Sequence, residues 1–181
     1  MMRKTTIYTL ALMMALLAVP LGAQAQKNVV EKVLTRQRTK TLKDGSLYKG
    51  DMMLMRPHGR GKRTYTDGTV YQGQFEHGRR QGKGTMTYPN GDKYEGLWHK
   101  NMRHGRGTYH YLDGKRFEGD FVEDIMQGFG TMYYVNGDTY TGLWEDGKRH
   151  GTGVYIWYYD GSNYNGEWHL DRKHGKGRMF W

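Results

Sequence analysis

Cysteine is absent from this chain, and proline occurs only three times in 181 residues. The lack of cysteine excludes disulfide bonds, thiolate metal ligands, a cysteine nucleophile and an acylated lipoprotein cysteine. Serine is also scarce, since Ser46 and Ser162 are the only two and both follow glycines. The folded chain must therefore be held together by packing alone, and no serine or cysteine stands out as a catalytic nucleophile.

Long apolar runs are absent except near the start, over residues 7–21. Arg3 and Lys4 precede this run, and Ala23-Gln24-Ala25 follows it in the pattern of a cleavage site. We therefore expect residues 1–25 to be a secretory signal peptide, with a periplasmic, cell-envelope or extracellular location for the rest. The alternative is an uncleaved anchor, although the run is shorter than the ~20 residues that span a bilayer.

The rest of the chain is basic, aromatic and rich in glycine. The formal charge is +10, and +8 without residues 1–25, while 14% of residues are aromatic and 27 are glycine. This composition is too apolar for disorder, but it has too few aliphatic residues after position 25 for one large aliphatic core. Basic and aromatic composition would suit nucleic acid, yet an exported protein is not expected to bind it.

A period of 23 residues organises the sequence. Each unit starts at an aromatic residue, and these are Tyr48, Tyr71, Tyr94, Phe117, Tyr140 and Tyr164. A Gly-x-Gly pair recurs in every unit, which argues against a phosphate-binding loop because such a loop occurs once per nucleotide site. The expected units are residues 48–70, 71–93, 94–116, 117–139, 140–163 and 164–181, preceded by an N-terminal segment and capping strand over residues 26–47.

Each unit is predicted to form two short strands. An aromatic, Gly, aromatic series at alternate positions places all three on one face of a strand, as in Tyr140, Gly142 and Trp144. Bare glycine backbone would make room for the rings of neighbouring strands. The predicted aromatic layer consists of Tyr48, Tyr71, Phe75, Tyr94, Trp98, Phe117, Phe121, Tyr140, Trp144, Tyr164 and Trp168.

Turns should join these strands into one sheet. Within a unit we expect a turn of about six residues. Between units, Asp-Gly or Asn-Gly pairs such as Asp67-Gly68 are strong hairpin signals, because both residues tolerate positive φ. Residues 35–45 suit a first strand. The predicted fold is all-β, an elongated, twisted antiparallel sheet of about six stacked 23-residue β-hairpin repeats.

The aligned residues resemble the MORN repeat family, whose unit is similar to Y-x-G-x-W-x-x-G-x-x-x-G-x-G-x-x-x-Y-x-D/N-G. The best matches are YEGLWHKNMRHGRGTYHYLDG and YTGLWEDGKRHGTGVYIWYYDG. The resemblance implies binding to acidic phospholipids, dimerisation or scaffolding of other proteins. Two departures are Met52, which replaces an aromatic, and an extra residue in unit five. We expect that residue to form a bulge, which leaves open whether Trp157 or Tyr158 faces the aromatic layer.

Cations recur near each turn, and a ridge of them along one edge would attract anions. The alternative is a solvated edge whose charges prevent aggregation. The candidate anion-binding ridge comprises Arg56, Arg60, Arg79, Arg80, Lys83, Arg103, Arg106, Lys148, Arg149, Arg172, Lys173 and Lys176.

Unit four has no Lys or Arg over residues 117–139 and carries several acids. Its turn therefore forms a candidate protein-docking notch at Glu123, Asp124, Ile125 and Met126, unless its acids match charges in adjacent units or the copy has drifted. Val154 and Ile156 make the outward face more apolar toward Phe180 and Trp181, as expected for pairing with a second copy or another protein.

Histidines precede several Gly-x-Gly pairs, but His150 and His174 should lie about 10 Å apart, too far to share a zinc ion. We expect them and Gln81 or Gln127 to satisfy the turns, and we expect no metal site, no cofactor, no small-molecule substrate and no catalysis. The primary hypothesis is a non-enzymatic, exported scaffold for protein contacts or self-association. The alternative is attachment to an anionic membrane lipid or envelope polymer.

Overall fold

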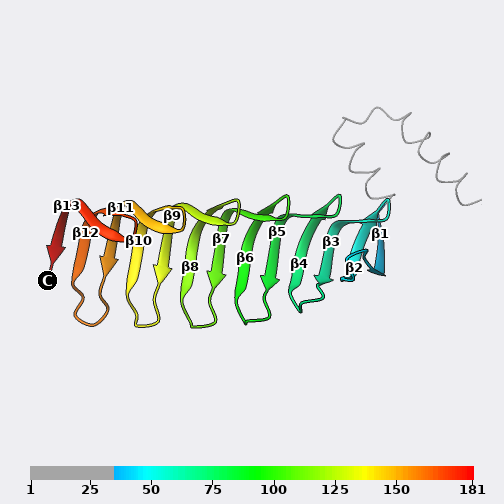
Figure 1. Ribbon diagram of the computed structural model, residues 1–181, viewed down its shortest axis with the longest axis horizontal. Helices are drawn as coiled ribbons and strands as arrows, with labels where there is room; N and C mark the ends of the chain where they lie inside the picture. The colour runs from blue at the N-terminus through cyan, green and yellow to red at the C-terminus, as the bar shows by residue number, and fades with distance from the viewer. Residues whose placement is uncertain (1–34) are drawn as a thin grey trace, which may run out of the picture.

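The computed structural model describes residues 35–181, which form one antiparallel sheet of thirteen strands and no helix (Figure 1). The strands lie in the sheet in their sequence order. Their bounds are β1 (Arg36–Thr41), β2 (Leu47–Met53), β3 (Arg56–Thr64), β4 (Val70–Glu76), β5 (Arg79–Thr87), β6 (Lys93–His99), β7 (Met102–His110), β8 (Arg116–Val122), β9 (Ile125–Tyr133), β10 (Thr139–Glu145), β11 (Lys148–Ile156), β12 (Asn163–His169) and β13 (Arg172–Phe180).

This architecture confirms the predicted fold class. Each unit is one hairpin, from β2 and β3 to β12 and β13, and the hairpins are stacked along one axis (Figure 1). The predicted first strand is β1, which pairs with β2. The predicted signal peptide and residues 26–34 lie outside the described residues. Within the described part of the chain, no helix has the length and apolarity needed to cross a membrane.

The Tyr-x-Gly sequence is explained by the way the tyrosine ring lies on its own strand. In β4, the Tyr71 hydroxyl donates a hydrogen bond to the carbonyl oxygen of Gln74 at 2.9 Å, so the ring passes over Gly73. Tyr48, Tyr94, Tyr140 and Tyr164 make the same bond to the third residue after them. A Cβ atom at Gly73, or at Gly84 on the paired strand β5, would overlap the Tyr71 ring. Glycine is therefore a steric requirement at both positions.

The rings form one continuous edge-to-face chain along the sheet. Tyr71 contacts Phe75 of its own unit at 5.0 Å and Trp98 of the next unit at 5.2 Å, with interplanar angles of 87° and 83°. All eleven rings of the predicted aromatic layer are buried. Edge-to-face pairs contribute about 0.5–1.5 kcal/mol each beyond the area that they bury. The core is thus a single layer of rings that joins every hairpin to its neighbours.

The first glycine of each Gly-x-Gly has another role, because it is the site of a β-bulge. Between the Gly73–Gly84 and Phe75–Arg80 pairs, β4 advances two residues while β5 advances four. Gly82 lies in the extra length with a φ of +62°. The same register shift occurs in the other five hairpins. A positive φ favours glycine, as in bulges of this kind.

The turns differ from the prediction. The turns within units contain two residues rather than about six, and both residues have positive φ, as at Lys100 and Asn101. This is the geometry of a tight turn that matches the twist of the strands. In the loops between units only the glycine has positive φ, while the preceding Asp or Asn accepts a bond from the backbone two residues later, as Asp67 does from Thr69 at 2.8 Å.

Unit five accommodates its extra residue in a loop rather than in a strand bulge, so the bulge prediction is wrong. Strand β11 ends at Ile156, and Gly161 N–H bonds to the Trp157 carbonyl oxygen, one residue further along than in the other loops. Trp157 packs against the buried rings, whereas Tyr158 is 75% exposed. Trp157 is therefore the residue that faces the aromatic layer.

The ring-over-glycine packing predicts a specific sensitivity. Gly84→Ala should lower the free energy of unfolding by about 1–3 kcal/mol, because the added methyl group overlaps the Tyr71 ring. Urea unfolding followed by tryptophan fluorescence measures the effect. The matched control is Thr85→Ala, one residue further along on the opposite face of the sheet. Equal losses in the two variants would contradict the steric explanation.

Candidate interaction surfaces

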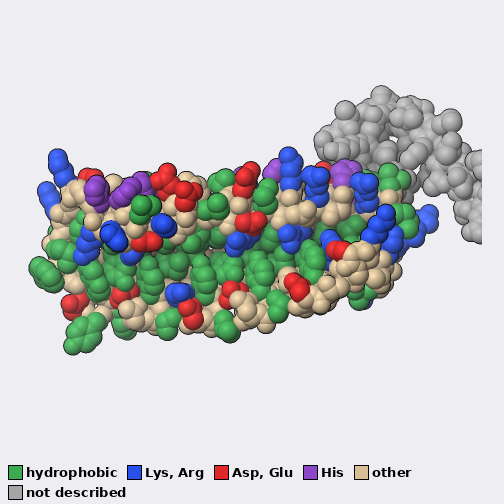
Figure 2. Space-filling model, viewed as in Figure 1, with side chains coloured by type: hydrophobic (Ala, Val, Ile, Leu, Met, Phe, Trp, Pro, Cys, Tyr) green, Lys and Arg blue, Asp and Glu red, His purple; other side chains and the backbone are tan. Residues whose placement is uncertain are grey.

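The sheet has two chemically different faces. The aromatic face carries the buried rings and appears as a continuous hydrophobic band along the long axis (Figure 2). The polar face carries the side chains that alternate with them, including Lys49, Lys62, Gln72, Thr85 and Glu95, which lie opposite one another on successive strands. A ligand would therefore meet different chemical groups on each face.

On the aromatic face, arginine side chains cover the rings and join neighbouring units. The Arg103 guanidinium lies 5.2 Å from the Tyr109 ring centre and 5.3 Å from that of Phe121. Its Nε donates to Asp124 Oδ1 at 3.0 Å, and a terminal nitrogen donates to the Asp124 carbonyl oxygen at 2.6 Å. Arg149 binds Asp171 in the same way. These arginines are therefore engaged within the sheet.

Two units replace this bridge with a simpler contact. Where the arginine position holds Pro57 or Met126, the matching turn residue of the next unit is Gly78 or Gly147. In both cases the glycine N–H still bonds to the carbonyl oxygen of the earlier unit, at 2.8 and 3.0 Å. The turn residue is therefore an Asp or Asn only in the units that follow an arginine, where its side chain or carbonyl oxygen accepts the arginine's hydrogen bonds.

Two partly buried tyrosine–aspartate pairs hold the loops at the other edge. The Tyr155 hydroxyl donates to Asp138 Oδ2 at 2.6 Å, and Tyr109 donates to Asp92 at 2.8 Å. Burial, followed by the hydrogen bond to the carboxylate, raises the pKa of both tyrosines. Burial alone would raise the pKa of Asp138, but hydrogen bonds from Tyr155, the Tyr158 N–H and Asn136 lower it overall.

The predicted ridge residues do not lie on a single surface. Arg80, Arg103, Arg149 and Lys173 lie over rings on the aromatic face. Arg60, Lys83 and Arg106, which lie between the two glycines of their units, are opposite Gln74, Leu97 and Asp120 on the polar face. Arg56, Arg79, Lys148 and Arg172 start the second strands beside the two-residue turns. The predicted ridge residues are thus distributed over both faces of the sheet and the edge beside the two-residue turns.

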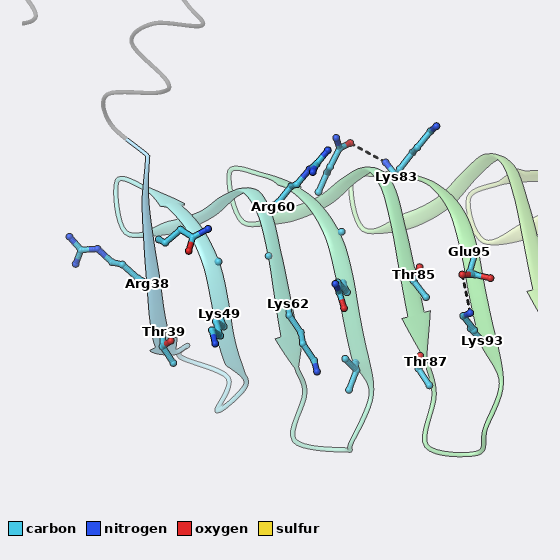
Figure 3. Close-up of a pocket in the computed structure, with 17 residues that line it drawn as sticks. Arg38, Thr39, Lys49, Arg60, Lys62, Lys83, Thr85, Thr87, Lys93 and Glu95 are labelled. Carbon is cyan, nitrogen blue, oxygen red and sulfur yellow. Dashed lines mark hydrogen bonds and ion pairs between the residues drawn. The ribbon is translucent and has the colours of Figure 1, made fainter.

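The polar face contains an open groove of about 1240 Å³ over β1 to β6. Its cations include Lys49 of β2, Arg60 and Lys62 of β3, and Lys83 of β5 (Figure 3). Within residues 35–181 none of these four side chains forms an ion pair, although the Arg60 backbone N–H donates to the Asp51 carboxylate at 3.0 Å, whereas the Lys93 side chain pairs with Glu95 at 2.9 Å. Lys49 was missed by the sequence reasoning, although the residue between each unit's tyrosine and glycine changes from basic to acidic along the chain.

The predicted notch in unit four is split by the sheet. Ile125 lies on the polar face, 45% exposed, while Met126 lies on the aromatic face near the Tyr111 hydroxyl. Asp124 accepts the bonds from Arg103, so one of the predicted charge matches to an adjacent unit exists. The two acids of the turn and the two apolar residues therefore do not form one surface.

A different apolar cluster occupies the polar face here. Val122 lies opposite Ile125, and Phe129 lies opposite Leu143, with exposures of 42–50% across the four side chains. Phe129 was missed, although it stands between the two glycines of unit four, where four other units carry a cation. We call these four residues the apolar cluster.

Histidines gather near the two-residue turns. His169 lies between His150 and His174, with ring centres 5.1 and 5.6 Å away, and sequence reasoning missed this intermediate position. The side-chain amide oxygens of Gln81 and Gln127 accept hydrogen bonds from backbone N–H groups of the next unit's turn, as predicted for these positions. Among the residues that the structure describes, no group of three or more His, Cys, Asp or Glu is placed to hold a metal ion.

The period, the glycine positions and the hairpin stack coincide with a known repeat. The family model of the MORN repeat matches residues 48–70, 71–93, 94–116, 117–139, 140–158 and 164–181. This chain belongs to the MORN repeat family. MORN repeats are generally modules that interact with proteins or membranes. No curated protein matches the sequence.

Solved structures to which this chain is similar include the TCP domain of Drosophila melanogaster SAS-4 (dCPAP) in complex with a proline-rich motif of Ana2 (dSTIL). It is 12% identical with a TM-score of 0.43, over 89% of this chain and 93% of that chain. The TCP10 domain of Danio rerio CPAP in complex with a STIL peptide is 16% identical with a TM-score of 0.37, over 72% and 68%. Both likenesses concern the course of the backbone.

The arginine bridge between MORN units gives a prediction. Arg103→Met should destabilise the chain by about 1–2 kcal/mol, because Asp124 loses the two guanidinium donors and keeps only the backbone N–H of residue 103. Adding Asp124→Gly recreates the native Met126–Gly147 arrangement, so the double variant should be more stable than the sum of the single effects by about 0.5–3 kcal/mol. A double-mutant cycle by urea unfolding measures this coupling. Additive effects would show that the bridge does not link the units.

The Asp138 site predicts a dependence of stability on pH. Because the folded-state pKa of Asp138 lies below the ordinary 3.8, its contribution is complete above that value and is lost as pH falls through the folded-state pKa. Asp138→Asn should lower the free energy of unfolding by about 1–3 kcal/mol at neutral pH. It should also reduce the further loss of stability that the chain shows in acid. Tyr155→Phe should weaken it less. Thermal midpoints measured between neutral pH and about pH 2 test this prediction. If both variants show the same dependence of the midpoint on pH as the unsubstituted chain, the role assigned to Asp138 is wrong.

Proposed function

We propose that this chain is a non-enzymatic, exported scaffold that binds protein partners through the polar face of its sheet. The residues of the aromatic face are engaged with one another, since its rings are buried and Arg103 and Arg149 bind the next turn. The polar face instead exposes groups that lack partners within residues 35–181, with cations toward β1 and apolar side chains over β8 to β10. A ligand would meet these groups first.

The single observation that carries this proposal is the apolar cluster. Val122, Ile125, Phe129 and Leu143 are all substantially exposed, and Phe129 and Leu143 are paired side by side. Acids surround them on the same face, including Glu118 and Asp120. Apolar side chains with a polar rim are typical of the centre of a protein interface, where charged residues are depleted. A protein surface can cover the apolar side chains and also pair with the surrounding acids, whereas an anionic headgroup layer is repelled by those acids.

The second candidate function is attachment to an anionic membrane lipid or envelope polymer. The cations beside the two-residue turns support it, because Arg56, Arg79, Lys148 and Arg172 are exposed along one edge. Attraction to an anionic surface is worth about 1 kcal/mol for each such cation and decreases with salt. Contact through the apolar cluster depends much less on ionic strength. Salt dependence therefore separates the two candidates.

Capture from the native envelope tests the proposal. The chain without residues 1–25 is immobilised, and bound proteins are identified at low and high salt. We expect at least one saturably bound protein that untagged chain displaces, and we expect Phe129→Asp with Leu143→Asp to abolish its capture. The matched control is Lys148→Glu with Arg172→Glu at the turn edge, which should leave capture intact. The N-terminal residue of the native chain in the same fraction shows whether cleavage follows Ala25.

The opposite pattern would refute the scaffold function. Capture that survives the aspartate substitutions, disappears with the edge reversals and falls steeply with salt would assign the chain to an anionic surface. Circular dichroism of each variant verifies that the sheet remains folded. Both substituted pairs are exposed or half-exposed, so the fold should be retained.

A further inference from the structure

The groove on the polar face has an electrostatic feature that packing does not explain. Lys49 and Lys62 lie directly opposite each other on β2 and β3, where like charges destabilise a sheet. Arg60 and Lys83 line the same groove on β3 and β5. Within the described part of the chain none of the four side chains forms an ion pair, and the one carboxylate bonded to them is that of Asp51, which accepts from the Arg60 backbone N–H at 3.0 Å. Four cations beside one acid leave an excess of positive charge in this part of the groove.

The cationic stretch ends sharply along the sheet. The row that contains Lys49 and Lys62 continues through Gln72 and Thr85 to Glu95, and further along it reaches Glu118. Over β7 and β8 the cations of this face are paired, since Arg106 lies 3.9 Å from Asp120 and Arg116 lies 3.3 Å from Glu118. An anionic ligand is therefore attracted over β1 to β5 and repelled by the acids on β6 and β8. The groove has a defined length rather than an indefinite one.

We propose that this groove binds a short, extended acidic segment of a protein partner, lying across the strands. This inference rests on the proposed scaffold function and names the chemistry of one partner contact. From β1 to β5 there are four strand spacings of ~4.8 Å, which give ~19 Å, or about six residues of extended chain. Gln72, Gln74 and Thr85 line the groove and offer donors and acceptors to the segment's backbone.

The limited length of the groove distinguishes this occupant from other polyanions. A bilayer surface is a plane, so it would face Glu95, Glu118 and Asp120 together with the four cations. A long anionic polymer would cross the same acids if it followed the sheet. A segment of about six residues fits the cationic part and avoids the acids. Charge complementarity of this kind chiefly sets specificity and the rate of association.

Binding of synthetic peptides tests the proposal. The probe is a fluorescent peptide of alternating Glu and Ser, about six residues long, and the matched peptide has Gln in place of Glu. Fluorescence anisotropy with the chain lacking residues 1–25 should show binding of the Glu peptide alone, weakening as salt increases. Lys49→Glu with Lys62→Glu should lower the affinity at least ~10-fold. Lys148→Glu with Arg172→Glu makes the same change in net charge elsewhere and should have much less effect.

A single substitution separates ligand binding from a structural role. Lys49→Glu places opposite charges on the Lys49–Lys62 pair, so it should raise the thermal midpoint while it weakens peptide binding. A residue retained for stability would show the reverse change in the midpoint. A lower midpoint, or unchanged peptide affinity in this folded variant, would overturn the proposal.

Further outcomes assign the groove differently. Equal weakening by the groove and edge reversals would show non-specific attraction and overturn the groove assignment. Sedimentation with phosphatidylglycerol vesicles that depends on Lys49 and Lys62, without peptide binding, would replace the acidic segment by a lipid surface. If peptide binding fails while envelope capture still depends on Phe129 and Leu143, the acidic-segment inference falls and the scaffold function stands.

Discussion

The structure depends on one steric relation, in which a tyrosine or phenylalanine ring lies flat across glycines of two paired strands. The ring of Tyr71 covers Gly73 and Gly84, and its hydroxyl reaches a carbonyl oxygen of its own strand. A side chain at either glycine would lift the ring and expose the layer beneath the arginines. Because Phe117 keeps the same position without a hydroxyl, the close approach to glycine matters more than the hydrogen bond.

This relation also determines where binding groups can lie. Every second side chain of each strand belongs to the aromatic layer or covers it. The alternating side chains on the other face do not contribute to this buried layer. Those positions vary freely along the chain, from Lys49 through Glu95 to Thr141, while the ring positions hardly change. The repeat thus separates the residues that fold the sheet from the residues that distinguish one region of its surface from another.

Much of this could be predicted from the sequence, because a period of 23 residues repeats the same local physics six times. The strands, the ring layer and the capping strand follow from alternation and from glycine spacing. The two-residue turns could not, since positive φ at residues such as Leu54 and Glu123 is unusual and is imposed by the bulge and the twist. The predicted ridge was divided because the bulge shifts the register, which turns Arg80 toward the rings and leaves Lys83 facing outward.

The equivalence of the contacts between units has a consequence for distance. Each hairpin meets the next through an equivalent ring pair and the same backbone bond at the turn, so inserting one hairpin between β7 and β8 preserves every junction. Such a change would alter the separation of the groove and the apolar cluster by two strand spacings, or about 10 Å. The sheet thereby acts as a molecular ruler, in which the number of hairpins sets how far apart two docked molecules are held.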